Sequence, residues 1–331
     1  MTLTDAQPTT LNRVRAMLPP LVAALAALLL NQVAPLLSPL LVAMVIGAVI
    51  VNTGLGRFTW LTSDNATTKL LLRIGVVMVG LRLPVNDVLA IGLPGVAVIV
   101  CTLAGTYWLT CRIGVRLGLD ERFVRVLAAG FSVCGAAAIA TVSDAVRARQ
   151  RDVALAVALV TIYGSAMILA LPWLADLIGL SRHEAGIWAG ASVHEVAQVA
   201  VAASLVGGGA LAVAMTVKLG RVALLAPLYV IIARDSDRDT GADRPHVPIL
   251  PWFVIGFAIA VAIRSTVPLS DSVLSTANQA TNLLLGAGMF GLGLGLKLKD
   301  LWPIPPAALV LATASTVVAA GISLTLILVL L

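Results

Sequence analysis

Long apolar runs follow one another along this chain, with only short polar connections between them. A bilayer core about 30 Å thick needs roughly twenty apolar residues per helix, and each run is about that long. Only 11% of the residues are charged, against about 25% in soluble chains, so no stretch is suited to a separate soluble domain. Only helices or closed barrels satisfy the backbone in lipid, and these runs are too uniformly apolar for barrel strands. We therefore expect an all-α polytopic membrane protein.

The apolar runs predict about eleven transmembrane helices. Arg13 and Arg15 precede the first run as in a signal peptide, but no convincing cleavage site follows, so we expect that helix to be retained. The predicted helices cover residues 17–33, 37–54, 68–84, 86–110, 123–144, 152–175, 185–206, 209–233, 249–266, 275–297 and 304–330.

Most Lys and Arg residues lie in the connections between the apolar runs. With the N-terminus in the cytoplasm, most of them face the cytoplasm, which is the usual orientation. The Arg147–Arg151 cluster then lies on the wrong side. Either that loop is an exception or segment 123–144 re-enters the membrane rather than crossing it, and the sequence leaves both open. The net charge of +6 does not indicate nucleic-acid binding, because no basic stripe is interleaved with aromatic residues.

The predicted helices suggest an internal repeat. Behind an N-terminal tail and extra helix (residues 1–35), the chain divides into a first five-helix repeat (36–176) and a second (177–331). An odd number of helices per repeat requires the two repeats to lie in opposite orientations. A rival alignment of Gly80–Leu83 with Gly295–Leu298 stays open. Inverted repeats with interrupted helices at corresponding positions are typical of secondary transporters.

A histidine, a glutamate and a glutamine interrupt the apolar segment 185–206. If the segment is one helix, His194, Glu195 and Gln198 lie within an arc of about 100° and share a face. An ionisable residue at membrane depth is expensive and usually marks a pathway. Because histidine titrates near neutral pH, we expect His194 and Glu195 to carry a coupling proton and Gln198 to orient them. The alternative for His194 is a hydrogen-bonded structural imidazole.

Lys218 and Arg221 lie three residues apart in the next apolar segment, after a short glycine-rich connection. Arg73 occupies a similar place, after Lys69, in the first repeat. One interpretation is an ion pair with Glu195 that holds two helices together. The other is a site for an anion, because these cations outnumber the carboxylate and the guanidinium fork suits oxyanions.

Glycines interrupt the fourth helix of the first repeat. The break predicts a half-helix whose free N–H groups bind an anion, together with nearby polar side chains. The predicted substrate-binding residues here are Ser132, Cys134, Gly135 and Ala136. The alternative is close helix packing by small residues.

Glycines also crowd the fourth helix of the second repeat. Gly286, Gly288 and Gly291 predict the second broken helix, and Asn282 would line its cavity. The same packing alternative applies.

Two near-motifs predict neither enzyme nor cofactor. Gly286–Gly291 matches the dinucleotide pattern G-x-G-x-x-G but has no strand before it. His194–Gln198 lacks the second histidine of the zinc motif H-E-x-x-H. Cys101, Cys111 and Cys134 lie in or beside apolar segments, where we expect small core residues rather than disulfides. We expect no metal, no cofactor and no catalytic activity.

Four segments resemble the YeiH-type family of conserved bacterial inner-membrane proteins, often labelled sulfate exporters. They are Leu70–Leu83, Ala129–Ala138, Val193–Val199 and Lys218–Pro227, and the resemblance extends over roughly residues 17–331. It implies a multi-pass protein of the bacterial inner membrane. It also implies the inverted-repeat architecture of bile acid:sodium symporters and sodium/proton antiporters. In that architecture two broken helices cross, and core and panel domains interleave across the repeats.

One residue departs from the family pattern. Phe131 stands where a small polar residue is usual, which leaves the polarity of the helix break open.

The sequence as a whole predicts a secondary active transporter of a small anion, with sulfate or a sulfonate first. The expected partners are that anion, a coupling proton or sodium, the lipid bilayer and a homodimer mate, but no nucleic acid. The first alternative is a cation/proton antiporter on the same fold. The second is a membrane scaffold or sensor that transports nothing.

Overall fold

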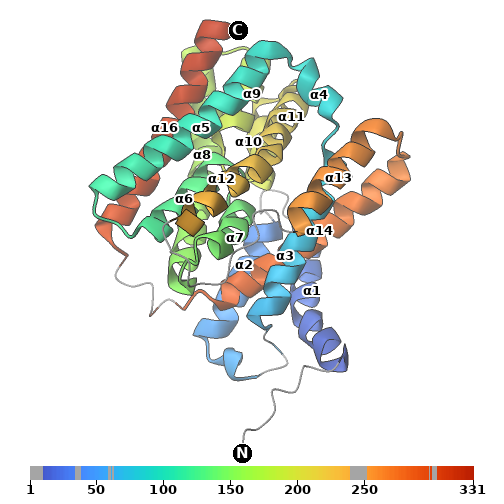
Figure 1. Ribbon diagram of the computed structural model, residues 1–331. Helices are drawn as coiled ribbons and strands as arrows, with labels where there is room; N and C mark the ends of the chain where they lie inside the picture. The colour runs from blue at the N-terminus through green and yellow to red at the C-terminus, as the bar shows by residue number, and fades with distance from the viewer. Residues whose placement is uncertain are drawn as a thin grey trace, which may run out of the picture.

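The computed structural model describes residues 10–33, 39–58, 61, 63–238, 252–297, 299 and 304–331 (Figure 1). The described residues form helices and no strand, which confirms the all-α prediction. The α-helices are α1 (Thr10–Val33), α2 (Pro39–Asn52), α3 (Asn65–Val79), α4 (Val85–Ala90), α5 (Gly92–Arg116), α6 (Glu121–Ser132), α7 (Ala136–Ala145), α8 (Gln150–Ile178), α9 (Arg182–Ser192), α10 (Val196–Val206), α11 (Ala210–Ala223), α12 (Leu225–Arg238), α13 (Trp252–Thr266), α14 (Asp271–Leu294) and α16 (Pro306–Leu330). Two short 3₁₀ helices are η1 (Leu55–Arg57) and η3 (Gly80–Arg82).

Five helical stretches among the described residues are long and apolar enough to cross a membrane. They are Ala16–Val33 of α1, Gly92–Arg116, Gln150–Ile178, Ala210–Ser236 through α11 and α12, and Pro306–Leu330. These stretches make the chain a polytopic helical protein. The larger number of spans stays a prediction, since α2, α10 and α13 are shorter apolar helices.

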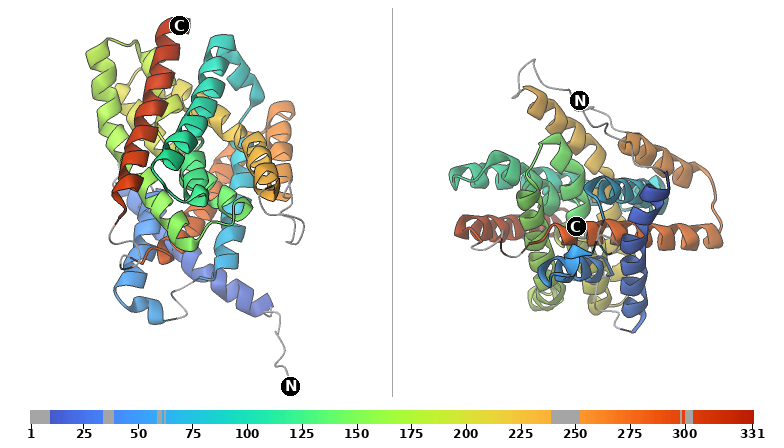
Figure 2. Two further views of the ribbon diagram at one scale, coloured as in Figure 1. Left: turned by 60° about the vertical axis from the view of Figure 1, so that its left-hand side comes forward. Right: turned by 90° about the horizontal axis from the view of Figure 1, so that it is seen from below.

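The helices gather in two bundles (Figures 1 and 2). The outer bundle consists of α1, α2, α3, α13 and α14, and α14 packs along α1, α2 and α3. The hairpin bundle consists of α5 to α11 together with α16, and α16 lies along α5. Each bundle therefore draws on helices from both halves of the chain, and the two repeats, 36–176 and 177–331, stay a prediction.

α6 and α7 form a re-entrant hairpin, here called the first hairpin. Asp120, just before α6, and Arg149, just after α7, form an ion pair at 2.8 Å, so both ends of the hairpin lie together. The turn contains Val133, Cys134 and Gly135, and the Gly135 N–H bonds back to the Gly130 carbonyl at 2.9 Å. Segment 123–144 is therefore a hairpin and not one straight helix, which favours re-entry of the two possibilities.

α9 and α10 form the second hairpin. Arg182 at the start of α9 lies against Gly208, just beyond α10, and Gly186 packs on the backbone of Ala210. The expectation of one continuous helix over 185–206 is therefore wrong, because the chain turns back at Val193–Glu195.

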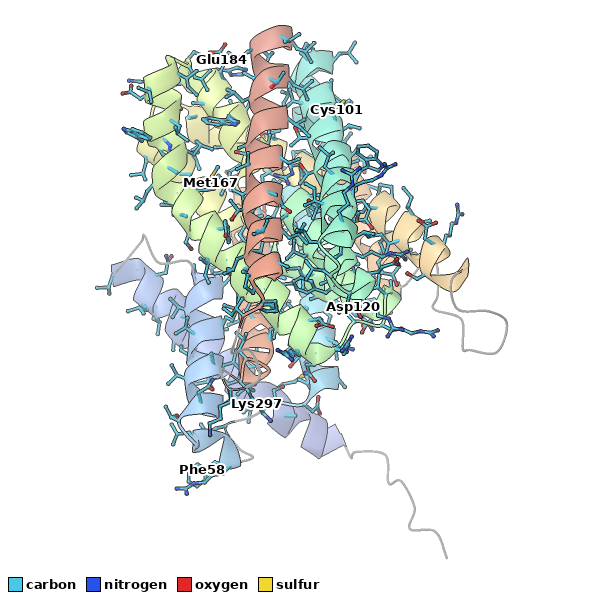
Figure 3. The ribbon with its side chains drawn as sticks, turned by 90° about the vertical axis from the view of Figure 1, so that its left-hand side faces the viewer. Phe58, Cys101, Asp120, Met167, Glu184 and Lys297 are labelled. Carbon is cyan, nitrogen blue, oxygen red and sulfur yellow. The ribbon has the colours of Figure 1, made fainter. Side chains whose placement is uncertain are left out.

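The two hairpins enter from opposite ends of α8, which connects them. Its 29 residues make a helix roughly 43 Å long at ~1.5 Å per residue, more than the hydrocarbon core of a bilayer. In Figure 3, Asp120 beside the first hairpin and Glu184 in the second lie at opposite ends of the hairpin bundle, with Met167 of α8 between them. Each hairpin thus reaches inward from its own side.

The second broken helix predicted at Gly286–Gly291 is wrong. α14 runs unbroken from Asp271 to Leu294. Its glycines instead allow close packing: a Cβ on Gly288 would lie 2.3 Å from the Leu72 side chain, and one on Gly286 would lie 3.1 Å from Ala24. A Cβ on Gly291 would likewise collide with the Thr68 side chain. Small residues let helices approach in this way, which was the packing alternative.

The hairpin topology predicts which loops share a side of the membrane. In a chain whose native cysteines are replaced by serine, Glu121→Cys and Gln150→Cys should both react with a membrane-impermeant thiol reagent from one side. His183→Cys should react from the other side. All three positions are exposed and flank the hairpins. Labelling of positions 121 and 150 from opposite sides would contradict the re-entrant first hairpin.

Candidate functional site

The tips of the two hairpins meet inside the protein at a buried lysine. The first tip is Val133–Gly135 and the second is Val193–Glu195. Lys218 of α11 donates from Nζ to the Val133 carbonyl at 2.8 Å and to the Val193 carbonyl at 2.7 Å. One ammonium group therefore joins both tips to α11.

Arg221, one turn further along α11, makes a second brace. Its Nε donates to the Ser132 carbonyl at 3.0 Å, and its two terminal nitrogens donate to the carbonyls of Phe131 at 3.0 Å and Ala191 at 2.6 Å. These carbonyls belong to the last turns of α6 and α9, where no backbone N–H of the same helix is available to donate to them.

The two cations compensate the C-terminal ends of two half-helices. Each such end carries roughly half a negative charge. Lys218 and Arg221 have no exposed surface, and among the described residues neither forms an ion pair. The ion pair with Glu195 that was one interpretation is thus absent there, and the two helix ends compensate about half of the positive charge of the two cations.

Glu195 stands at the start of α10 with its carboxylate against the start of α7. A Cβ on Gly135 would lie 2.6 Å from the Glu195 Cγ, so the two tips touch here. The side chain is only 3% exposed, and the Gln198 backbone N–H approaches it as in a capping box, although neither oxygen has a hydrogen bond of standard geometry. The Ala136 N–H and the Thr161 hydroxyl are its polar neighbours, and the Thr161 hydroxyl also lacks a partner. A buried carboxylate held this loosely is available for a proton or a ligand.

Gln198 fixes the second tip to α8. Its Oε1 accepts from the Glu195 backbone N–H at 3.1 Å, and its Nε2 donates to the Thr161 carbonyl at 3.2 Å. Gly164 of α8 leaves the space for this amide, since a Cβ there would collide with it. The predicted orienting role of Gln198 fits this geometry, through the backbone rather than through a shared helical face.

His194 lies on the far side of the tip from the carboxylate's cavity. Its ring packs on Phe131 at a centroid distance of 4.5 Å, and its Nε2 lies 3.2 Å from the Thr316 hydroxyl on α16. That hydroxyl also lies within hydrogen-bond distance of the Ala312 carbonyl, and the ring lies beside the Phe131 backbone. These contacts match the structural imidazole that was the alternative for this residue.

The four residues predicted to bind the substrate at the break between α6 and α7 have different surroundings. The Ser132 hydroxyl bonds to the Ala129 carbonyl at 3.3 Å, and Ser132 contributes its own carbonyl to Arg221. Cys134 and Ala136 line the cavity described below, and Gly135 caps α7 with φ = 79°. Of the residues predicted from the first break, Cys134 and Ala136 are the ones that line the cavity.

Lys69 and Arg73 do not join the buried cations. Both pair with Asp144 near the end of α7, at 2.5 and 2.7 Å, and all three side chains are partly exposed. The related sequence patterns thus serve different purposes: this cluster ties the first hairpin to α3, whereas Lys218 and Arg221 tie the hairpin tips together.

A cavity of about 300 Å³ lies between the two bundles. The hairpin bundle contributes Glu195, Cys134 and Ala136 to its wall. The polar residues that the outer bundle contributes are Asn31, Arg82 and Asn282. Apolar side chains of α3, α11 and α14 line the space between: Leu72, Val76, Val79, Leu219, Val222, Leu285 and Met289. Sequence reasoning included Asn282 but missed Arg82 and Thr161. The pattern Glu195-x-x-Gln198 resembles a capping box, and this signal could have located the second break.

Gly135 gives a stability prediction. Gly135→Ala should cost about 2 kcal/mol or more, because φ is positive there and the added methyl would meet the Glu195 side chain. Gly118→Ala is the matched control, since φ is +70° but nothing lies within 4 Å, so the strain alone of about 1 kcal/mol remains. Thermal unfolding of both variants in one detergent measures the difference. Equal midpoints would mean that the tips are not in close contact.

Comparison with known proteins agrees with the resemblance seen in the sequence. Residues 16–312 match the family model described as Conserved hypothetical protein 698. A UPF0324 membrane protein of Corynebacterium glutamicum is 41% identical, covering 92% of this chain and 88% of that protein. A UPF0324 membrane protein of Pseudomonas aeruginosa is 36% identical over 80% of this chain and 78% of its own length. The UPF0324 inner membrane protein YeiH of Escherichia coli strain K12 is 32% identical over 78% of this chain and 76% of its own length. No solved structure matches the chain. This chain is similar to UPF0324 membrane proteins, among them YeiH, and it is therefore a membrane protein of the Conserved hypothetical protein 698 family.

Proposed function

We propose that this protein is a secondary active transporter that moves a small anion together with a proton. Sulfate or a sulfonate is the first substrate to test. The observation that carries the proposal is Glu195: a buried carboxylate without an ion pair among the described residues, at the junction of two opposed re-entrant hairpins, on the wall of a cavity.

The arrangement of the bundles suits alternating access. The cavity lies where the hairpin bundle meets the outer bundle, so rocking one bundle against the other would open it to either side in turn. The Asp144 cluster links α7 to α3 near the entrance of the first hairpin. In this proposal it must separate when that side opens.

Anion binding and proton binding are linked through Glu195. The first turns of α7 and α10 border the cavity, and the N-terminal end of a helix favours a negative group. The Glu195 carboxylate occupies that position in the absence of substrate. Protonating it removes its charge, so an anionic group of the substrate then takes its place beside Cys134, Gly135 and Ala136.

Lys218 and Arg221 act through the tips in this mechanism. Their bonds to carbonyls of both hairpins fix the helix starts that receive the anion, and their charges raise the potential nearby. Gln198 holds the Glu195 backbone, and His194 packs behind the tip.

The same model accounts for the basic loops. If the N-terminus is cytoplasmic, re-entry of the first hairpin returns the Arg147–Arg151 loop to the side of Arg116 and Arg122, as the positive-inside rule prefers. We propose this orientation in the bacterial inner membrane, where the UPF0324 inner membrane protein YeiH relatives are named as residing.

The experiment is uptake of labelled sulfate and methanesulfonate into sealed proteoliposomes, with and without an imposed pH gradient, beside protein-free liposomes. Uptake that depends on the gradient supports the proposal. Uptake driven by a sodium gradient and insensitive to pH would contradict the proton coupling.

One observation favours a second candidate, a cation/proton antiporter. Glu195 is the acidic residue on the cavity wall, and a carboxylate there could hold a sodium ion directly. Sodium-dependent thermal stabilisation that is lost in Glu195→Gln, without any response to anions, would select this candidate.

A further inference from the structure

The outer wall of the cavity carries a partly buried cation, Arg82, whose charge the described residues do not balance. Arg82 of η3 donates from one terminal nitrogen to the Asn278 carbonyl at 2.6 Å and to the Asn282 Oδ1 at 2.8 Å. Its Nε is buried without a partner, and none of the ion pairs among the described residues includes Arg82. Both of its oxygen partners are neutral. A guanidinium in this situation favours an anionic group from elsewhere.

The cavity thus has two polar walls with an apolar zone between them. One wall is Glu195 with the helix starts of α7 and α10, and the other is Arg82 with Asn282. The intervening side chains, among them Val76, Leu219 and Leu285, offer no hydrogen bonds. The cavity of about 300 Å³ extends across both walls, and sulfate, with five heavy atoms, would fill only part of it.

We propose that the substrate is a short organic anion with an acidic group at each end of an apolar chain. This inference rests on the proposed transport function and specifies its substrate class. One acidic group pairs with Arg82 and Asn282, and the apolar chain lies along α3, α11 and α14. The second acidic group lies at the starts of α7 and α10 once Glu195 is protonated. Neither inorganic sulfate nor an acid with one charged end satisfies both walls.

The test compares acids that differ only in the second charged group. Binding to the purified full chain is measured by calorimetry over a series of pH values, for α,ω-dicarboxylates from succinate to suberate. Each is paired with the monocarboxylate of the same carbon number. At the best chain length, the dicarboxylate should bind at least tenfold more tightly than its partner, since a charge-assisted hydrogen bond contributes on that order.

Asn282→Asp is the decisive variant, because it preserves the shape of the site. The new carboxylate keeps the bond to Arg82 and supplies the missing negative charge from within the protein, so the fold should be retained. The tenfold preference should fall to about threefold or less, since the outer wall no longer attracts an anion. Gln279→Glu is the matched control: it adds the same charge on an exposed position of α14, and the preference should persist.

A second pair of variants tests the apolar zone independently. Ala200→Phe fills part of the cavity from α10 and should abolish dicarboxylate binding, whereas Ala212→Phe on the exposed face of α11 should not. Equal binding of mono- and dicarboxylates at every length, or a preference that survives Asn282→Asp, would overturn the assignment.

Transport and substrate class can fail separately. If sulfate enters proteoliposomes under a pH gradient but no dicarboxylate competes, the two-ended substrate is wrong and the transporter stands. If dicarboxylates bind with the expected sensitivity to Asn282→Asp but nothing enters sealed vesicles, the site stands and the transport proposal fails.

Discussion

Replacing Arg221 by methionine should destabilise the protein by about 3–5 kcal/mol. The guanidinium has no exposed surface and donates to carbonyls at the ends of both α6 and α9. Methionine fills a similar volume but leaves those buried carbonyls without donors, and each orphaned group costs about 1–3 kcal/mol. The measurement is the thermal unfolding midpoint and the monodisperse yield in one detergent, at one scan rate.

A surface arginine provides the control for Arg221. Arg112 lies over the Trp108 ring at 4.5 Å, and the same change to methionine there should cost about 1 kcal/mol or less. Arg221→Lys keeps the charge but not the fork, so its midpoint should fall between the two. If Arg221→Met unfolds like the wild type and loses only its response to anions, the arginine is a substrate ligand rather than a brace between the hairpins.

Replacing Glu195 by glutamine should abolish the pH dependence of anion binding. In the wild type the anion and the proton favour each other, so affinity is greatest where Glu195 is protonated. As pH rises through its ionisation, the dissociation constant should increase by up to about tenfold per pH unit, the slope for one linked proton. Glutamine mimics the protonated form, so binding in that variant should be tight and flat with pH. Calorimetric titrations at a series of pH values measure both slopes.

Other titratable groups around Glu195 need their own controls. Lys218 and Arg221 on α11, Cys134 in the first tip and His194 in the second are the groups nearby. His194→Gln should keep the slope, because the imidazole packs against Phe131 and Thr316 away from the cavity. A slope that disappears in His194→Gln and persists in Glu195→Gln would move the coupling role to the histidine.

The predictions from sequence were most accurate where a physical property is local. Hydropathy and the spacing of charges gave the membrane class, the helical class and most helix positions, because lipid imposes those on each segment separately. The same reasoning selected the polar residues that the structure brings together at the two hairpin tips and on α11, since a polar group at membrane depth stands out in any arrangement.

Predictions of helix breaks from glycines were right at one site and wrong at another, depending on the helices around each glycine. Gly135 has a positive φ and marks a real turn, whereas Gly286, Gly288 and Gly291 lie inside a straight helix and allow close packing. Composition alone does not distinguish the two cases, because the difference lies in the neighbouring helices. At the second break, Val193–Glu195 contains no glycine, and its helix start is capped by Gln198.

The sequence by itself determined that this protein is a helical membrane protein with a few ionisable residues buried in an apolar chain. Only the tertiary structure decided that segments 121–145 and 182–206 turn back instead of crossing, because a break of three residues is compatible with either direction. It also decided the partners of Lys218 and Arg221. Counting charges predicted that a carboxylate or a substrate would be their partner. Their partners are instead backbone carbonyls at the ends of two half-helices, because the tips of both hairpins pack against α11. Glu195 is left beside the cavity without an ion-pair partner in the described part of the chain, and that consequence of the packing is absent from the sequence pattern.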